Sequence, residues 1–265
     1  MDSTAPPPQP AAPSEPTFHR RPLPADLVDF SSPEGRRLLV EALTQGTAEA
    51  FYPLVAQLHT QAEPAWCGLG TLVTVLNALD VDPGRVWKGP WRWFGEELLD
   101  CCVSLDRATA EGLQLVEVAC LAQCNGAQAE WVVAEPAGLP AFRAALEAAC
   151  RAPAGPFLVA AYARGALGQT GAGHYSPLAA WHAPSDQVLI LDVARFKYPP
   201  HWVPLTRLWT AMQEVDPVSG QARGWLRIGR SATPQVDPVA AAALAARLEE
   251  AGAARVPGCP PVPRP

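Results

Sequence analysis

The sequence predicts an α+β protein whose helical first part is followed by an antiparallel sheet. Up to about residue 150, apolar residues recur at three- and four-residue steps, the spacing of helices that bury one face. After Gly155, short apolar runs alternate with Gly, Pro, Ser and Asp, which is typical of strands joined by turns. The 265 residues, 49% of them hydrophobic, can fill one sizeable core, so a chain disordered throughout is excluded.

The helical part contains six expected helices. The first begins at Ser31-Ser32-Pro33-Glu34, which has capping-box chemistry, and ends at Gly46; the second is capped by Thr47 and reaches about Leu58. The stretch CGLGTLVTVLNAL carries the stripe of a buried helix that starts at Cys67. Three further helices are expected over 95–101, 111–123 and 139–150.

The second part contains the expected strands. Three runs have strand character, PFLVAAYA, GHYSPLAAWHA and QVLILDVARF, and residues 183–186 between the last two form a predicted hairpin turn. This hairpin would place the His174 strand beside the Asp192 strand. A short helix over 204–213 and a strand over 224–229 complete the unit.

Proline gathers at both ends of the chain, which indicates tails around one folded domain. We expect a Pro-rich disordered tail over 1–24, a folded domain over 25–230 and an Ala/Pro-rich tail over 231–265. In the last tail, 237–251 follows the pattern of a capped helix with an early proline and a glycine after it.

Charge and hydropathy exclude two classes of partner. The formal net charge of −6 argues against a nucleic-acid-binding surface built on bulk positive charge. No run approaches the roughly 18 to 20 apolar residues that cross a bilayer, and the N-terminal sequence lacks the apolar stretch of a signal peptide. We therefore expect a cytoplasmic protein that binds neither nucleic acid nor membrane.

Four residues have the types and order needed for nucleophilic catalysis. Cys67 begins a helix, whose dipole is expected to lower the pKa of the thiol. His174 can take the thiol proton, and Asp192 can fix the tautomer of the ring. Gln61 can donate its side-chain amide to a developing oxyanion. The order Gln, Cys, His, acid is that of papain-like cysteine enzymes, although a lone Cys on an apolar helix is more often an inert buried residue.

Four stretches resemble the catalytic domain of phytochelatin synthase. They are QAEPAWCGLGTLVTVLNAL, DPGRVWKGPWRWFGEELLDCC, QTGAGHYSPLAAW and LILDVARFKYPPHWVPLTRLW, within a similarity that covers residues 28–230. The resemblance implies a papain-like fold and glutathione γ-glutamylcysteinyltransferase activity. It also implies the roles already assigned above: Cys67 as nucleophile, His174 as base, Asp192 as orienting acid and Gln61 as oxyanion donor.

The resemblance further implies how glutathione is bound. Asp216 would bind the α-amine and Arg223 the α-carboxylate of the γ-glutamyl group, and Arg164 is a second candidate for the carboxylate. From the sequence alone, a turn Asp and a solvated Arg are the favoured interpretation of Asp216 and Arg223. A second, acceptor glutathione is expected at Arg195, Lys197 and Tyr198. The alternative there is that Phe196 and Trp202 pack into the core while the charged side chains face solvent.

The seven cysteines raise the question of metal binding. Without a secretory signal we expect reduced thiols. Cys101, Cys102, Cys120 and Cys124 supply four thiols that could hold Zn²⁺ or Cd²⁺, or could be buried reduced cysteines; no role is predicted for Cys150 and Cys259. The resemblance implies no organic cofactor, and activation by Cd²⁺ or Zn²⁺ largely as a metal–glutathione thiolate substrate.

The expected function is therefore synthesis of phytochelatin from glutathione for heavy-metal detoxification. The expected partners are glutathione, phytochelatin peptides and thiophilic metal ions, with a homodimer left open. The alternatives are a deglycinating hydrolase of glutathione and its S-conjugates, a non-catalytic metal-thiolate protein, and, least favoured, a general endopeptidase.

Many plant members carry a further Cys-rich C-terminal region, whereas this sequence ends in AARVPGCPPVPRP. Ala163 also stands where many members have His.

Overall fold

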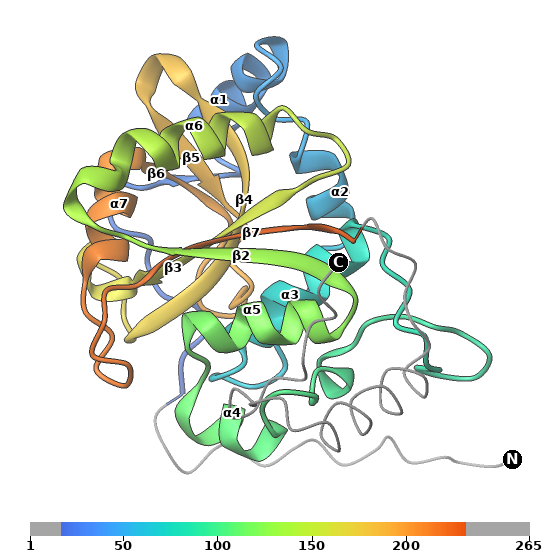
Figure 1. Cartoon of the computed structure of the whole chain (residues 1–265). Helices are drawn as coiled ribbons and strands as arrows, with labels where there is room; N and C mark the ends of the chain where they lie inside the picture. Colours follow the sequence, from blue (N-terminus) through green and yellow to red (C-terminus); the bar gives the residue numbers. More distant parts are fainter. Residues whose placement is uncertain (1–16, 232–265) are drawn as a thin grey trace, which may run out of the picture.

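A computed structural model describes residues 17–231, and its centre is a seven-stranded sheet (Figure 1). The strand order is β1-β6-β5-β4-β3-β7-β2, and every neighbouring pair is antiparallel. The strands are β1 (Val28–Asp29), β2 (Ala127–Val133), β3 (Phe157–Ala163), β4 (Gly173–His182), β5 (Gln187–Ile190), β6 (His201–Pro204) and β7 (Gly224–Arg230).

Helices cover both faces of this sheet. Strand β3 shows the division, because Phe157, Val159 and Ala161 belong to one apolar cluster while Leu158 and Ala160 belong to another. In Figure 1, α5 lies below the sheet and α6 above it. The first face carries α1 (Pro33–Thr44), α2 (Phe51–Ala56), α3 (Cys67–Ala78), α4 (Leu105–Glu111) and α5 (Leu115–Cys124); the second carries α6 (Leu139–Cys150) and α7 (Leu205–Gln213).

Most of the expected elements are present in the structure. Helix α1 begins after Ser32, whose Oγ accepts the backbone N–H of Gly35 at 3.0 Å. Helix α3 begins at Cys67, and α6 and α7 lie within a residue of their predicted bounds. The hairpin turn over 183–186 is confirmed, because β4 and β5 pair antiparallel on either side of it.

Three predicted helices differ in the structure. Thr47 does not cap α2, which starts at Phe51; its hydroxyl instead donates to the carbonyl of Ala42. The helix predicted over 111–123 is interrupted at Gly112, whose positive φ of 73° ends α4, and α5 then starts with a capping box. The segment 95–101 contains only the short 3-10 helix Glu96–Leu98.

Three strands are absent from the sequence prediction. β1 and β6 are short, with two and four residues, so they show little alternation. β2 forms one edge of the sheet, pairs with β7 alone and leaves Trp131 and Val132 exposed, so its pattern does not look like a buried strand. The strands that single-sequence patterning misses are therefore the two edge strands, β1 and β2, and the short inner strand β6.

The ends of the described chain bear on the predicted boundaries. Residues before 25 already contact the domain, because the N–H of Arg21 donates to the carbonyl of Lys197 and Leu23 packs against the second apolar cluster. The predicted helix over 237–251 and Cys259 lie outside the described residues. Within residues 17–231, no helix is long and apolar enough to cross a membrane.

Gly224 is predicted to be essential for pairing β7 with β2. A Cβ atom there would overlap the carbonyl oxygen of Val132, which is backbone and cannot move aside cheaply. We expect Gly224→Ala to lower the free energy of unfolding by about 2 kcal/mol or more in denaturant titrations. Gly165→Ala is the matched control, because a Cβ there meets nothing within 4 Å. Equal stabilities of the two variants would contradict this account of the β2–β7 edge.

Candidate active site

The predicted nucleophile and base meet at one cleft. Cys67 is the first residue of α3 and His174 the second residue of β4, and α3 packs against β4. Both side chains line a cleft of about 290 Å³, together with Tyr175, Asp216 and Arg223. Residues more than a hundred positions apart in the chain therefore share one site, as the sequence predicts.

His174 is oriented by a buried carboxylate. Its Nε2 lies 2.9 Å from Oδ1 of Asp192, which is fully buried directly after β5. The same oxygen accepts the backbone N–H of Ala194 at 2.9 Å. With Nε2 committed to Asp192 as the donor, Nδ1 is the ring nitrogen left to accept a proton. This is the arrangement a general base needs.

Arg164 completes the buried group behind His174. Its guanidinium donates two bonds of 2.9 Å to the two oxygens of Asp192 and one of 2.6 Å to Oε1 of Gln169. The opposite charges of His174 and Arg164 hold the pKa of Asp192 well below its usual range, against the effect of burial. Arg164 does not line the cleft. The structure therefore places Arg164 as a buried partner of Asp192, outside the lining of the cleft where the sequence led us to expect it.

The pKa values describe a neutral pair in the free protein. Burial raises the pKa of the Cys67 thiol, and the backbone of Tyr175 and the charge of Arg164, which lower it, do not compensate for the loss of water. Burial, followed by the positive charge of Arg164, lowers the pKa of His174 to about 4. The predicted lowering of the thiol pKa by the helix dipole is therefore wrong, and proton transfer has to accompany attack.

Gln61 supports the loop that leads into Cys67. Its side chain is buried, and Nε2 donates to the carbonyls of Glu63 at 2.8 Å and Pro64 at 3.0 Å. Pro64 lines the cleft, but Gln61 does not. The amide thus fixes the rim of the site in this structure, and its role as an oxyanion donor stays a prediction.

Asp216 and Arg223 lie in the cleft with Cys67. They flank a turn, in which Oδ1 of Asp216 accepts the N–H of Val218 at 3.0 Å. Arg223 is 8% exposed; its Nη1 donates to the carbonyls of residues 214 and 215, while Nε and Nη2 face Gly173, next to His174. Asp216 is thus a turn residue and a cleft residue at once, and Arg223 is not simply solvated.

The basic and aromatic residues expected at an acceptor site do not line this cleft. Arg195 is exposed, whereas Tyr198 is buried and its hydroxyl accepts the N–H of Thr170 at 2.8 Å. Lys197 is partly exposed, and burial lowers its pKa. The alternative core packing holds for Trp202, which is fully buried, but not for Phe196, which is 47% exposed.

Two features of the cleft were not found from the sequence. Tyr175 follows His174 in β4, and its buried hydroxyl donates to the carbonyl of Leu113 at 3.0 Å. Arg107 on α4 bonds Glu117 on α5 at 2.6 Å, and both line the wall of the cleft. In the sequence, the only sign of a paired Arg107 is Glu111, four residues later on the same helix. Such pairs are common on exposed helices and do not indicate a cleft.

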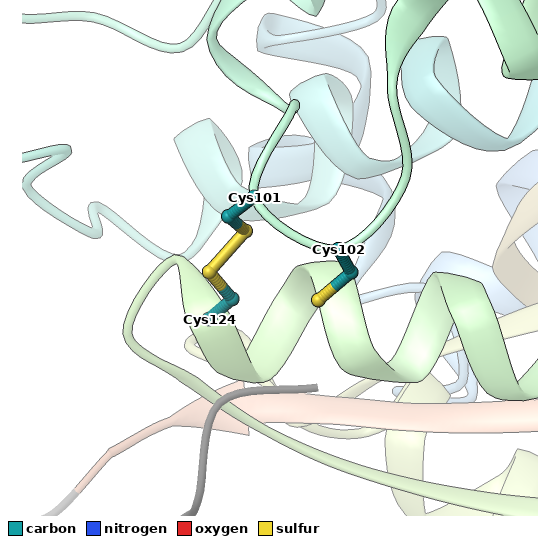
Figure 2. Close-up of side chains that lie close together, drawn as sticks. All are labelled: Cys101, Cys102 and Cys124. Carbon is teal, nitrogen blue, oxygen red and sulfur yellow. A yellow bond between two sulfur atoms is a disulfide. The ribbon is translucent and has the colours of Figure 1, made fainter. Parts of the chain in front are cut away.

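Four of the cysteines form a cluster away from the cleft lining, and Figure 2 shows three of them, Cys101, Cys102 and Cys124. Disulfides join Cys101 to Cys124, with Cα atoms 6.5 Å apart, and Cys102 to Cys120, with Cα atoms 6.3 Å apart. The expectation of reduced thiols is therefore contradicted for these four. Within the described residues, Cys67 and Cys150 are the free cysteines. The sulfur atoms of Cys101, Cys102 and Cys124 lie within 4.8 Å of one another.

Comparison with known proteins decides the family. The model of the phytochelatin synthase family matches residues 18–225. The chain belongs to this family. Among its curated relatives, glutathione gamma-glutamylcysteinyltransferase 3 of Lotus japonicus is 50% identical over 214 residues, 80% of this chain and 44% of the relative. The Schizosaccharomyces pombe glutathione gamma-glutamylcysteinyltransferase is 41% identical over 210 residues, 79% of this chain and 50% of the relative.

The family relationship covers one part of those longer proteins. The chain spans about half the length of the curated relatives it matches, including 44% of glutathione gamma-glutamylcysteinyltransferase 1 of Arabidopsis thaliana, to which it is 47% identical. Among solved structures, a double glycine motif protease from an AMS/PCAT transporter, in complex with the leader peptide, matches 66% of this chain and 91% of its own, with 17% identity and a TM-score of 0.39.

The neutral Cys67–His174 pair predicts how the thiol reacts with pH. Only the thiolate is alkylated, and burial raises the pKa of Cys67. We expect the rate of iodoacetamide modification at Cys67, followed by peptide mass spectrometry, to rise with pH up to and beyond pH 9. A preformed thiolate–imidazolium pair would instead give a rate that is already at its plateau between about pH 5 and 8.

Proposed function

We propose that this chain is a glutathione γ-glutamylcysteinyltransferase that makes phytochelatin through a Cys67 thioester. The observation that carries the proposal is the cleft in which Cys67 and His174 lie together with the carboxylate of Asp216 and the partly free guanidinium of Arg223. Family membership and the names of the relatives support the same activity. The papain-like order of nucleophile, base and acid along the chain agrees with it.

In the first half of the reaction, Cys67 attacks the carbonyl carbon of the Cys–Gly amide of glutathione. Because the free pair is neutral, the thiol proton passes to Nδ1 of His174 as the sulfur–carbon bond forms. The resulting imidazolium is stabilised by the anionic Asp192 at Nε2. His174 then returns the proton to the nitrogen of glycine, the amide bond breaks, and a γ-Glu-Cys thioester stays on Cys67.

In the second half, a nucleophile releases the acyl group. The α-amine of a second glutathione, or of a growing oligomer, attacks the thioester carbonyl while His174 removes its proton. The product is lengthened by one γ-Glu-Cys unit and the thiol of Cys67 is restored. Attack by water would give γ-Glu-Cys alone, which is the hydrolase alternative. The two functions share the acyl-enzyme and differ only in the acceptor.

The donor site is proposed to recognise both charges of the γ-glutamyl end. The carboxylate of Asp216 suits the α-ammonium group, and Nε and Nη2 of Arg223 suit the α-carboxylate as a planar fork. Two carbonyls already accept bonds from Nη1, so the guanidinium is held in one orientation. A site with two charged ends also disfavours long peptide chains, which argues against a general endopeptidase.

Heavy metal is proposed to enter the reaction with the substrate. Cys67 is the one cysteine that lines the described cleft, and its sulfur carries the acyl group, so a soft cation at the acceptor position would take its thiolate ligands from glutathione. Cd²⁺ or Zn²⁺ bound by two glutathione thiolates is therefore the proposed form of the acceptor. No organic cofactor is needed for either acyl-transfer step.

A metal-thiolate function at the four-cysteine cluster is a second candidate. Cys101, Cys102, Cys120 and Cys124 bring four sulfur ligands together, the number that tetrahedral Zn²⁺ or Cd²⁺ requires. Disulfide bonds and metal binding exclude each other, because the ligand is the thiolate. We propose that the cluster holds a soft cation only after a thiol reductant has opened both disulfides, each taking two electrons and two protons.

Cys67→Ala is predicted to abolish turnover. With glutathione and Cd²⁺, the unmodified protein should release free glycine and form (γ-Glu-Cys)n-Gly, and the variant should do neither because no thioester can form. Cys150→Ala is the matched control, since Cys150 is a free, fully buried cysteine at the end of α6, outside the cleft lining. Glycine release by folded Cys67→Ala would overturn the proposed function, and γ-Glu-Cys without oligomers would favour the hydrolase.

Asp216→Asn and Arg223→Lys are predicted to weaken binding of glutathione more than they slow the chemical step. Asp216→Asn keeps the size of the side chain and removes its charge, and Arg223→Lys keeps the charge and removes the planar fork, so KM should rise about tenfold or more. Steady-state kinetics of glycine release provide the measurement. A fall in kcat with unchanged KM would place the γ-glutamyl end elsewhere.

The cluster proposal predicts metal binding that depends on reduction. After treatment with a phosphine reductant and its removal under argon, Cd²⁺ alone should produce thiolate-to-metal absorption in the ultraviolet, and Cys101→Ser/Cys124→Ser should lose most of it. Cys67→Ser is the control and should keep it. Equal absorption by the double variant and the unmodified reduced chain would refute a site at the cluster.

A further inference from the structure

Glu96 is a buried carboxylate that contacts the loop leading into the nucleophile. It opens the 3-10 helix Glu96–Leu98 and is 3% exposed. Its Oε2 accepts the backbone N–H of Ala62 at 3.0 Å and lies 3.4 Å from Nε2 of His59. The segment 59–66 runs from these contacts directly into Cys67, so Glu96 is tied to the approach to the active site although it does not line the cleft.

The same loop is fixed on its other side by the segment that follows the catalytic acid. The backbone N–H of Gln61 donates to the carbonyl of Val193 at 3.0 Å, one residue after Asp192. Gln61 therefore lies between two anchors, the Asp192 segment on one side and Glu96, through Ala62, on the other. Removal of either anchor would let the loop move relative to His174.

Gly70 shows how closely these groups pack on α3. A Cβ atom there would lie 3.0 Å from Oε1 of Glu96 and 3.1 Å from Cβ of Gln61. Gly70 is three residues after Cys67, so Glu96 and Gln61 both lie against the first turn of the catalytic helix. A displacement of either side chain would act directly on the position of that turn.

Three buried polar atoms in this contact have no hydrogen-bond partner: Oε1 of Glu96, Oε1 of Gln61 and Nε2 of His59. A buried carboxylate oxygen without a donor costs free energy, and an apolar residue would avoid the cost. Glu97, the next residue, is exposed and uses its carboxylate to accept a bond from the Trp87 ring nitrogen. Neither solubility nor a gain in folding stability therefore explains why a glutamate is buried at position 96.

We propose that Glu96 is a positioning residue, which holds the loop 59–66 so that Gln61 and the start of α3 are correctly placed for attack on the substrate carbonyl. The inference rests on the proposed function, because it concerns the acylation step of that reaction. Glu96 acts through Ala62 and Gln61 and touches no reacting atom. The hydrogen bond between Glu96 and this loop is the one accepted from Ala62, so glutamine can replace Glu96 there and alanine cannot.

The test compares Glu96→Ala, Glu96→Gln and the control Glu97→Ala by glycine release from glutathione. We expect Glu96→Ala to lower kcat about tenfold or more with KM changed less than about threefold, since oxyanion-side contacts act on the transition state. Glu96→Gln should recover most of kcat, and Glu97→Ala should match the unmodified protein. If Glu96→Ala does not fold, Glu96→Asp, which shortens the reach to Ala62, should show the same loss of kcat.

A double-mutant cycle separates positioning from general destabilisation. In the Gln61→Ala background, Glu96→Ala should add less than about a threefold further loss, because both changes release the same loop. Folded Glu96→Ala with the kcat of the unmodified protein, or losses that multiply fully in the double variant, would overturn the inference. If the unmodified chain itself releases no glycine, the proposed function fails, whereas glycine release unaffected at Glu96 overturns this inference alone.

Discussion

The site depends on one buried anion, the carboxylate of Asp192. It is fully buried, yet it accepts bonds from His174, from Arg164 and from the backbone of Ala194. Without these donors, a carboxylate removed from water would take up a proton. With them it stays charged and selects the tautomer of His174 that leaves Nδ1 free. The chemistry of Cys67 therefore follows from how well this one charge is compensated.

The sheet brings these donors together. The hairpin between β4 and β5 returns the chain so that Asp192 follows β5 beside the start of β4, where His174 lies. Arg164 follows β3, whose antiparallel pairing with β4 sets Tyr162 opposite His174. Three neighbouring strands thus deliver one residue each. The nucleophile comes from α3 on the face of the sheet, through a loop that the Gln61–Val193 hydrogen bond ties to the segment after Asp192.

Those parts of the site that depend on local sequence patterns could be predicted from the sequence. The apolar stripe of α3 places Cys67 at a helix start, and the turn over 183–186 brings His174 toward Asp192. The pairing of Arg164 with Asp192 could not be predicted, because it depends on the β3–β4 register and not on spacing along the chain. In the sequence, Arg164 stands in a loop before a glycine-rich stretch, so we expect it to bind the substrate. Its pairing with Asp192 is known only from the structure.

Burial explains the other differences between expectation and structure. The helix start at Cys67 is visible in the sequence, but the burial that raises the pKa of the thiol depends on what packs over it. The pairing of four cysteines depends on the approach of the 101–102 segment to α5, which spacing alone does not give. The first turn of α5 lines the cleft through Glu117, and its last turn carries Cys124. Helix α5 therefore contributes both to the wall of the cleft and to the disulfide cluster.

Titration of the His174 imidazole by nuclear magnetic resonance, with ¹⁵N-labelled histidine, tests the central claim most directly. Burial and the nearby guanidinium make protonation in the folded site cost about 3 kcal/mol more than in water. The account predicts a neutral ring with the proton on Nε2 at pH 7, and a pKa of about 4. A ring that is protonated at neutral pH, or a neutral ring with the proton on Nδ1, would contradict it.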